Sequence, residues 1–313
     1  LRATMTVQQC FEKIRAEAID KETIYTCYVT DEQKKLIGIV TVKDLLLHKF
    51  DEQIGTFMED NYIYADTLTD KEEVANDLSK YDLLAVPIVD QENRLVGIVT
   101  VDDALDVITE EATEDISYLS SVTPSDKPYF ETSTVRTYLH RLPWLLILMI
   151  GATFTGLILN TYQAMLFPVI VACVPMVMGT GGNAGSQASV TIIRGMVLDQ
   201  IRPRDILKVI WKELRVGLLI GLSVALVCYG KLLLIDNLLL GYGYDWYISL
   251  AIAVALGIAV IVAKIVGCCV PLFAKAIRID PAVFANPFIT TITDIVSLLI
   301  LCGVTIGIFG LVA

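Results

Sequence analysis

Polar and apolar positions divide the chain into two halves with different patterns. Five apolar stretches occupy residues 142–159, 165–193, 216–235, 247–273 and 283–312. A helix needs about 20 apolar residues to cross a hydrocarbon core of roughly 30 Å, so each stretch predicts a membrane-spanning helix. Residues 1–135 instead hold short β-branched runs between polar turns, which is the pattern of a small soluble α/β unit.

The soluble half contains an internal repeat. Residues 29–46 and 89–105 match each other, with GIVTVKD beginning at Gly38 and GIVTVDD beginning at Gly97. Each copy predicts two short strands joined by a polar turn, with a helix directly after the second strand. Between the copies, residues 70–84 predict an amphipathic helix and residues 85–89 a buried strand.

This repeat resembles a pair of CBS modules, in which the first module here is short of its opening strand. The resemblance rests on a Gly-h-h-Thr-x-x-Asp motif, where h is apolar, and the motif occurs twice. It implies a cleft that often binds adenosine nucleotides such as ATP, with the Thr near phosphate and the Asp near ribose. These roles would fall on Thr41 and Asp44 in the first copy and on Thr100 and Asp103 in the second. A plain helix N-cap explains the same spacing and stays open as the alternative.

Charge is distributed very unevenly. Residues 1–135 hold 28 Asp or Glu against 12 Lys or Arg, a net −16, while residues 136–313 hold 7 against 12, a net +5. Such an acidic soluble half would repel nucleic acid and favours cations as partners. The seven cysteines form no CxxC pair and there are two histidines, so we expect neither disulfides nor a zinc site. The first residue is not Met, so we expect the sequence to begin within a longer protein.

An acid-rich connector joins the two halves. Residues 102–131 are rich in Asp and Glu with little compensating Lys or Arg, and residues 108–119 have helical spacing. Carboxylates brought close together repel, so a compact arrangement would need divalent cations, and the connector predicts a cation-sensing brace. A solvated linker helix remains the alternative. The expected regulatory cation ligands lie in turns or at element ends: Asp90, Glu92, Asp102, Asp126 and Glu131.

Asp294 is the first candidate for function in the membrane half. An acid inside a membrane-length apolar helix costs about 2.5–3.5 kcal/mol on insertion scales, so such residues usually face a protected polar path. Asn286, Thr290 and Asp294 recur at i, i+4 and i+8 and therefore share one side of the helix. This spacing predicts a line of oxygen ligands. A buried ion pair with Lys264, which lies at a similar depth in the fourth stretch, is the alternative.

The second apolar stretch combines prolines with a glycine-rich run. Pro168, Pro175 and the run from Gly179 to Gln187 are expected to interrupt the helix and free backbone groups, which at membrane depth are tolerated only against protein or a watery cavity. We therefore expect pore-lining positions here, and a tight helix contact through small residues is the alternative. The expected pore-lining residues are Gly179, Gly181, Gly182 and Asn183.

Basic residues set the expected orientation. Six Lys or Arg between residues 194 and 215 crowd one loop, and Lys275 and Arg278 lie in another. The positive-inside rule puts these loops and the soluble half in the cytoplasm and the C-terminus outside. The predicted location is the plasma membrane, with the lipid bilayer around several spans.

Two membrane segments carry a second resemblance. Residues 175–195 (PMVMGTGGNAGSQASVTIIRG) and 280–294 (DPAVFANPFITTITD), placed after the repeat and the connector, are similar to the MgtE family of magnesium channels or transporters. The resemblance implies a homodimer of five-helix membrane domains, with a pore on the two-fold axis lined by the second and fifth helices. It also implies hydrated Mg²⁺ at Asp294, assisted by Thr290 and Asn286, and pore closure when cytosolic Mg²⁺ bridges the acidic regions. This sequence does not include the N-terminal helical domain usual in the family, by truncation or by nature, so we expect some cation-bridging partners to be missing from it.

The predicted fold is therefore mixed: a cytosolic α/β CBS pair over 1–107, an acidic connecting helix over 108–141, and an all-α membrane domain of five helices over 142–313. The predicted function is passive, Mg²⁺-gated magnesium uptake, without enzymatic activity. A transporter of another divalent cation (Co²⁺, Mn²⁺ or Ca²⁺) is the first alternative. The others are an intramembrane aspartyl protease, which needs a second close carboxylate, and a nucleotide-sensing membrane protein.

Overall fold

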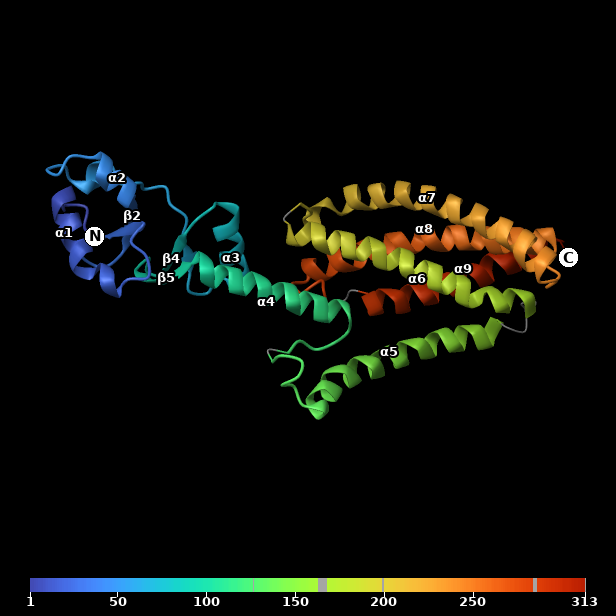
Figure 1. Cartoon of the computed structure of the whole chain (residues 1–313). Helices are drawn as coiled ribbons and strands as arrows, with labels where there is room; N and C mark the ends of the chain where they lie inside the picture. Colours follow the sequence, from blue (N-terminus) through green and yellow to red (C-terminus); the bar gives the residue numbers. More distant parts are fainter. Residues whose placement is uncertain (126, 163–167, 199, 284–285, 313) are drawn as a thin grey trace. The chain divides into compact units, whose positions relative to one another are not determined.

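The structure is a computed structural model that describes residues 1–125, 127–162, 168–198, 200–283 and 286–312 (Figure 1). The chain forms two compact units, Leu1–Thr113 and Glu114–Ala313. Helix α4, which spans Val101–Leu119, begins in the first unit and ends in the second.

The first unit has the repeated α/β architecture that its sequence predicts. Its first copy comprises α1 (Val7–Glu17), η1 (Ala18–Asp20), β1 (Thr26–Thr30), β2 (Leu36–Thr41), α2 (Val42–Leu47) and η2 (Ile54–Thr56). The second copy comprises β3 (Ala65–Asp66), α3 (Lys71–Lys80), β4 (Ala85–Val89), β5 (Leu95–Thr100) and α4. In the sheets, β1 pairs antiparallel with β2, β4 pairs antiparallel with β5, and β3 pairs parallel with β4.

The two copies repeat at the level of single hydrogen bonds. In the β1–β2 turn, Asp31 Oδ1 accepts the backbone N–H groups of Gln33 and Lys35 at 2.9 and 2.8 Å. In the β4–β5 turn, Asp90 Oδ1 accepts those of Glu92 and Arg94 at 2.9 Å each. Asp side chains favour such turns because they replace backbone acceptors. In the first copy, Leu1 exchanges hydrogen bonds with β1, accepting from the Thr30 N–H and donating to the Tyr28 carbonyl.

Each copy has its own small core. Val7, Val29, Val40, Leu45 and Ile54 are at most 1% exposed in the first copy. The second is built around Val74, Ala75, Leu78, Val86 and Ala104, so that α3 and α4 both pack against its sheet. These residues follow the periods of two in strands and of three to four in helices that the sequence contains.

The second unit is helical. It comprises α5 (Thr134–Tyr162), α6 (Pro168–Val197), η4 (Pro203–Asp205), α7 (Ile206–Lys231), the π-helical η5 (Leu232–Leu239), α8 (Trp246–Ala276) and α9 (Asn286–Val312). Within the described ranges, five helical segments are long and apolar enough to cross a membrane. Figure 1 shows α6 to α9 side by side and α5 along one edge, where it packs on α9. The five predicted spans are therefore confirmed.

The expected interruption of α6 is wrong. Residues 168–197 form one continuous α-helix with Pro175 inside it and the glycine-rich run in its second half. Pro175 removes one backbone hydrogen bond. Membrane helices tolerate such a proline because neighbouring helices, side chains or water can satisfy the freed carbonyl group. Gly181, Gly182 and Gly185 lie at close helix contacts, whereas a Cβ on Gly179 would meet nothing within 4 Å.

Glycines allow α8 to approach two neighbours closely. A Cβ on Gly267 of α8 would overlap the carbonyl of Gly185 on α6. A Cβ on Gly221 of α7 would lie 2.7 Å from the carbonyl oxygen of Gly257 on α8. Small residues at helix contacts are the usual means of bringing membrane helices together, because packing supplies the attraction there. The centre of the bundle is therefore built on backbone contacts.

We expect Gly267→Ala to lower the unfolding midpoint of the full chain in detergent, because its Cβ must displace the Gly185 backbone. Overpacking a tight contact costs about 1–3 kcal/mol. Gly303→Ala on α9 is the matched control, since a Cβ there meets nothing within 4 Å. Thermal unfolding followed by circular dichroism measures the difference, and equal midpoints for the two variants would contradict the close contact.

Candidate functional site

Asp294 lies on α9 where this helix packs against the glycine-rich part of α6. Its Oδ1 is 3.4 Å from the position that a Cβ on Gly182 would take, and the Thr290 methyl carbon Cγ2 is 3.5 Å from the same position. The carboxyl group is partly exposed within the single chain. Because Asp294 is eight residues into α9, the helix rise puts it about 12 Å along that helix.

The structure describes the side chain of one of the two other predicted ligands on α9, Thr290, but not that of Asn286. The Thr290 hydroxyl donates a hydrogen bond of 2.9 Å to the Pro287 carbonyl, one turn before it, so its oxygen keeps a free lone pair. Thr290 and Asp294 share the side of α9 that faces Gly182, as their spacing predicts. The side chain of Asn286 lies outside the described residues.

Lys264 does not neutralise Asp294. It pairs instead with Glu213 of α7, with 3.8 Å between Nζ and Oε2, and the two residues are 4% and 8% exposed. Among the described side chains, no Lys, Arg or His forms an ion pair with Asp294. The alternative in which Lys264 and Asp294 form a sealed pair is therefore wrong for this structure.

Glu213 was not identified as a candidate from the sequence. It stands just before the third apolar stretch and among basic residues, so it reads as part of a loop. A signal was nevertheless available, because a lysine deep in an apolar helix requires a counter-charge, and Glu213 is an acid on a neighbouring span. Only the packing of α7 against α8 identifies it as the partner.

The glycine-rich run of α6 divides into two faces. Gly181 and Gly182 are buried against α9, where a Cβ on Gly181 would overlap the Ser297 hydroxyl. This is the tight contact through small residues that the sequence left open. Gly179 and Asn183 lie on the other side and are exposed, as is Gln187 one turn further on. An exposed polar stripe on a membrane helix needs a protein partner or water beside it.

Both Thr-x-x-Asp motifs lie where a strand ends and a helix begins. Thr41 and Asp44 form a capping box at the start of α2, in which each side chain accepts a hydrogen bond from the other's backbone N–H. The Thr100 hydroxyl donates to Asp103 Oδ2 at 3.1 Å at the start of α4. Hydrogen bonds from Thr41 keep the pKa of the Asp44 carboxyl below its ordinary value although burial opposes this. The capping role is therefore present in the first copy, and in the second copy the Thr and Asp side chains contact each other.

A cleft lies beside the strand that leads into the second motif. Its volume is about 430 Å³, and it lies between β5 and the segment from α1 to β1. Leu95, Val96 and Gly97 line one side, and Lys21, Thr26 and Tyr28 line another. Volumes of 300–1,000 Å³ are typical of small-molecule sites. Thr100 is the last residue of this strand and Asp103 lies in the first turn of α4, and both lie beyond the residues that line the cleft.

Two of the five expected regulatory acids, Asp90 and Glu92, form local ion pairs. The Arg94 guanidinium donates to Asp90 at 2.9 Å and pairs with Glu92 at 2.6 Å. The Arg94 backbone N–H is the main cause of an Asp90 pKa below its ordinary value. Asp102 is exposed in the first turn of α4, and Glu131 is exposed before α5. Asp126 lies outside the described residues.

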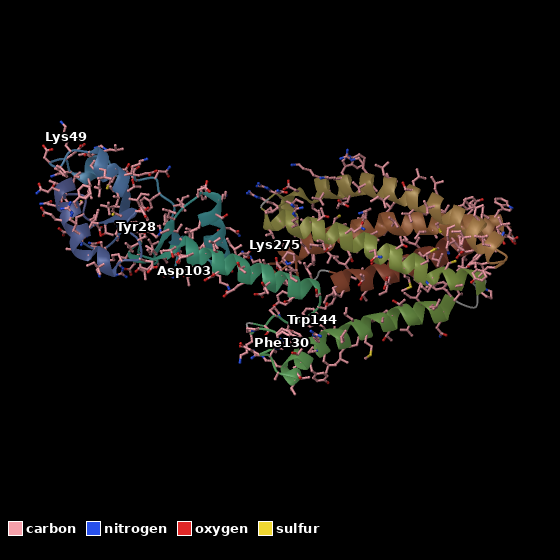
Figure 2. The ribbon with its side chains drawn as sticks, viewed as in Figure 1. Tyr28, Lys49, Asp103, Phe130, Trp144 and Lys275 are labelled. Carbon is pink, nitrogen blue, oxygen red and sulfur yellow. The ribbon has the colours of Figure 1, made fainter. Side chains whose placement is uncertain are left out.

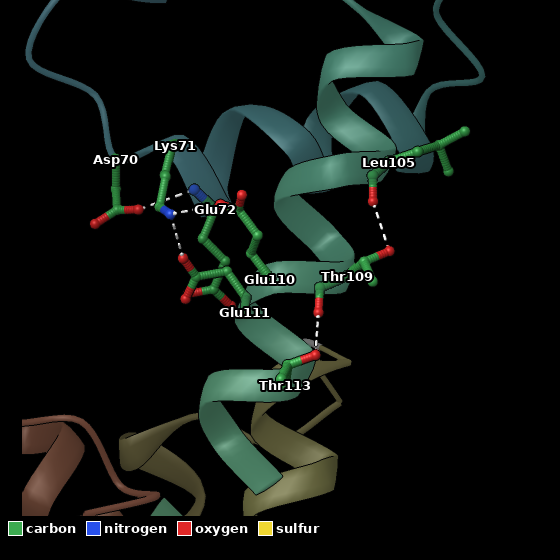
Figure 3. Close-up of polar contacts among 8 residues, drawn as sticks. All are labelled: Asp70, Lys71, Glu72, Leu105, Thr109, Glu110, Glu111 and Thr113. Atoms are coloured by element: carbon green, nitrogen blue, oxygen red, sulfur yellow. Dashed lines mark hydrogen bonds and ion pairs between the residues drawn. The ribbon is translucent and has the colours of Figure 1, made fainter. Parts of the chain in front are cut away.

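Lys71 provides a further counter-charge for the connector. Figure 3 shows Lys71 of α3 reaching Glu110 and Glu111 of α4, at 3.4 and 3.0 Å. These pairs are exposed, and such pairs stabilise little in water. The Lys71 ammonium group nevertheless reduces the repulsion between the two glutamates, and a metal cation could replace it there. No group of three or more His, Cys, Asp or Glu converges in the described part of the chain.

The architecture defines the class: a polytopic membrane protein with a tandem CBS-like unit before its helices. A CBS-domain model matches residues 1–50 and 54–110, and the MgtE model, described as a divalent cation transporter, matches residues 174–304. The chain belongs to the MgtE family, as the resemblance in the sequence predicted. This is a transporter family and not an enzyme family.

Two relatives illustrate the similarity. The chain is 38% identical over 308 residues to the magnesium transporter MgtE of Thermus thermophilus, covering 97% of this chain and 66% of that protein. It is 34% identical over 302 residues to the magnesium transporter MgtE of Bacillus subtilis, covering 96% and 65% respectively. The chain thus spans slightly less than two thirds of the length of these curated relatives.

Among solved structures, the chain is similar to the cytosolic domain of the Mg²⁺ channel MgtE in complex with ATP. The identity is 44%, the coverage 34% of this chain and 43% of that one, and the TM-score 0.34. It is also similar to the soluble part of a magnesium transporter, with 38% identity, coverage of 36% and 44%, and a TM-score of 0.35.

We expect Lys264→Met to destabilise the full chain, because it leaves the Glu213 carboxylate buried without a partner. Removing one partner of a buried pair costs about 3–5 kcal/mol. The double variant Lys264→Met/Glu213→Leu should recover most of the loss, since no unpaired charge then remains. Thermal unfolding in detergent measures the stability of the parent, the two single variants and the double variant, which together form a double-mutant cycle. If the double variant lost the sum of the two single losses, the pairing would be disproved.

Proposed function

We propose that this chain is a passive magnesium uptake channel or transporter, with a pore between two copies and a gate that responds to cytosolic Mg²⁺. The observation that carries the proposal is the Asp294 carboxyl group. It is partly exposed on α9 beside Gly182, and Lys264 is engaged elsewhere. An acid in this setting fits a passing cation better than a structural ion pair.

The chemistry of the site suits Mg²⁺. This ion prefers an octahedron of oxygens and sheds water reluctantly, so it usually keeps several waters and binds one or two carboxylates. Asp294 and Thr290 offer a carboxylate and a hydroxyl on one helix face, with the backbone of α6 close by. An inside-negative potential of 100 mV favours entry of a divalent ion by about 4.6 kcal/mol, so passive uptake requires no ATPase site. Another divalent cation is the nearest alternative cargo.

A homodimer is part of the proposal. The exposed stripe of Gly179, Asn183 and Gln187 on α6 would be covered or hydrated at an axis between two copies. In the first unit, Leu46 and Leu47 of α2 are 70% and 75% exposed, and Leu105 of α4 is 59% exposed. Apolar side chains gathered on two equivalent helices suit burial against a second copy. Two copies would also bring two Asp294 carboxylates to one path.

The proposed orientation places the first unit and the basic loops in the cytoplasm and the C-terminus outside, as the positive-inside rule requires. The bilayer in question is the plasma membrane. With this orientation, cytosolic Mg²⁺ reaches the acidic residues of α4 and its surroundings. We expect it to compete with Lys71 and Arg94 for these carboxylates and to favour the closed state. Asp90, Glu92, Asp102, Asp126 and Glu131 remain the expected regulatory ligands.

The enzyme alternative has little support. An intramembrane aspartyl protease needs two carboxylates that share a proton. In the described spans, the other buried acids are Glu213 and Asp236, and these pair with Lys264 and Lys231 respectively. If the parent chain cleaved a peptide substrate and Asp294→Asn did not, that result would support the protease alternative.

We expect Asp294→Asn to reduce Mg²⁺ flux into vesicles at least about tenfold, because the amide keeps the shape and removes the charge that attracts the ion. Asp245→Asn, at an exposed carboxyl group before α8, is the matched control and should keep parental flux. Uptake by the reconstituted full chain is followed with a Mg²⁺-sensitive dye trapped inside the vesicles. Parental flux in Asp294→Asn would refute the proposed ion path.

A second proposal concerns the cleft beside β5, which we propose binds an adenosine nucleotide with Asp103 at the ribose. We expect Asp103→Asn to weaken ATP binding by about tenfold or more, because the amide can still accept the hydrogen bond from Thr100 but has lost its charge. Asp106→Asn, one turn along α4, is the control. Equilibrium dialysis with labelled ATP measures binding, and equal affinity in the two variants would rule out this role for Asp103.

A further inference from the structure

Three aromatic rings from three helices form a continuous contact in the second unit. The Tyr118 ring, near the end of α4, lies 6.3 Å from the Trp144 ring of α5, with 61° between their planes. The Trp144 ring in turn lies 6.2 Å from the Phe288 ring of α9, at 79°. Both pairs have the edge-to-face geometry that aromatic rings prefer. We call this set the aromatic joint.

Hydrogen bonds fix the chain on both sides of the aromatic joint. Trp144 Nε1 donates to the Thr123 hydroxyl at 3.1 Å. The Thr123 backbone N–H donates to the His140 carbonyl at 3.1 Å, and His140 Nδ1 lies 3.1 Å from the Thr123 carbonyl. The segment that leaves α4 is therefore held against the first turns of α5. Figure 2 labels Trp144 near the start of that helix.

Helix α5 is weakened at this point. Pro143 directly precedes Trp144 within the helix, and a proline cannot donate to the carbonyl four residues before it. The stretch of α5 that carries Trp144 can therefore bend more easily than the rest. A displacement of the end of α4 would act on α5 where its backbone is least constrained.

A second contact sets the rotation of α9 relative to α5. A Cβ on Gly151 of α5 would lie 2.6 Å from the Thr291 methyl group. Trp144 and Gly151 are seven residues apart and share one face of α5, and Phe288 and Thr291 share one face of α9. The adjacent positions on α9 are Thr290 and Asp294. Any rotation of α9 that follows its contact with Trp144 therefore moves both proposed ion ligands.

We propose that the aromatic joint couples the position of α4 to the rotation of α9, with Trp144 as a positioning residue for Thr290 and Asp294. The inference rests on the proposed function and names a route by which cytosolic Mg²⁺ regulates the ion path. Coupling between two sites needs an element whose equilibrium both sites bias, and α9 held by Trp144 is that element.

The first test measures Mg²⁺ flux through the reconstituted full chain as a function of Mg²⁺ on the side of the first unit. In Trp144→Leu, flux at low Mg²⁺ should remain, and the concentration for half-inhibition should rise about fivefold or more, the lower range of allosteric couplings. Trp144→Phe retains a ring and should restore most of the parental response. Trp211→Leu, at an exposed tryptophan of α7, is the matched control. An unchanged half-inhibition in Trp144→Leu would overturn the coupling.

The second test needs no transport. In the full chain carrying Trp211→Phe and Trp246→Phe, the emission comes from Trp144 alone. Mg²⁺ should shift this emission, and Tyr118→Leu and Phe288→Leu should each abolish the shift. If Mg²⁺ leaves the emission unchanged, or if the shift remains in both Tyr118→Leu and Phe288→Leu, the aromatic joint is refuted as a coupling element. If the parent passes no Mg²⁺ while its emission still responds in this way, the proposed function fails and the joint stands.

Discussion

A carboxyl group inside an apolar helix is the constraint on which the membrane unit depends. Asp294 cannot be surrounded by lipid at acceptable cost, so a polar environment must exist beside α9. Gly182 provides space for the carboxylate, and Gly181 allows α9 to approach α6 closely. Lys264, the other charge at this depth, is satisfied by Glu213 on the opposite side of α8. Two charged groups in one bundle thus have separate environments, one closed and one partly open.

The bundle keeps these environments apart through close backbone packing. Contacts at Gly185 and Gly267, and at Gly221 and Gly257, bring α6 and α7 against α8. Because these contacts involve backbone atoms and few long side chains, they leave little freedom for α8 to move. Helix α5 lies at the edge and packs on α9 through Trp144 and Gly151. The helix at the edge of the bundle therefore contacts the helix that carries Asp294.

The excess of acid in the soluble half is reduced locally by a few basic groups. Arg94 serves both Asp90 and Glu92, and Lys71 serves Glu110 and Glu111. Such exposed contacts are weak and are screened by salt, so divalent cations can replace them at small cost. Many acids with few basic partners make a surface whose preferred arrangement depends on the ions around it.

Most of what could be predicted from the sequence follows from patterns among residues close together in the chain. The five spans follow from the length and composition of apolar runs, and the two CBS copies follow from a repeat that the Asp31 and Asp90 turns reproduce bond for bond. The side of α9 that holds Thr290 and Asp294 follows from helical period alone. What only the tertiary structure decided concerns partners far apart in the chain. The glycines of α6 could unwind a helix or pack it, and the presence of Ser297 and Ala263 beside them selects packing. Lys264 could pair with Asp294 or Glu213, and it pairs with Glu213 because α7 packs against α8. Residue type and spacing determine which groups need a partner, whereas the identity of that partner depends on which helix faces lie together.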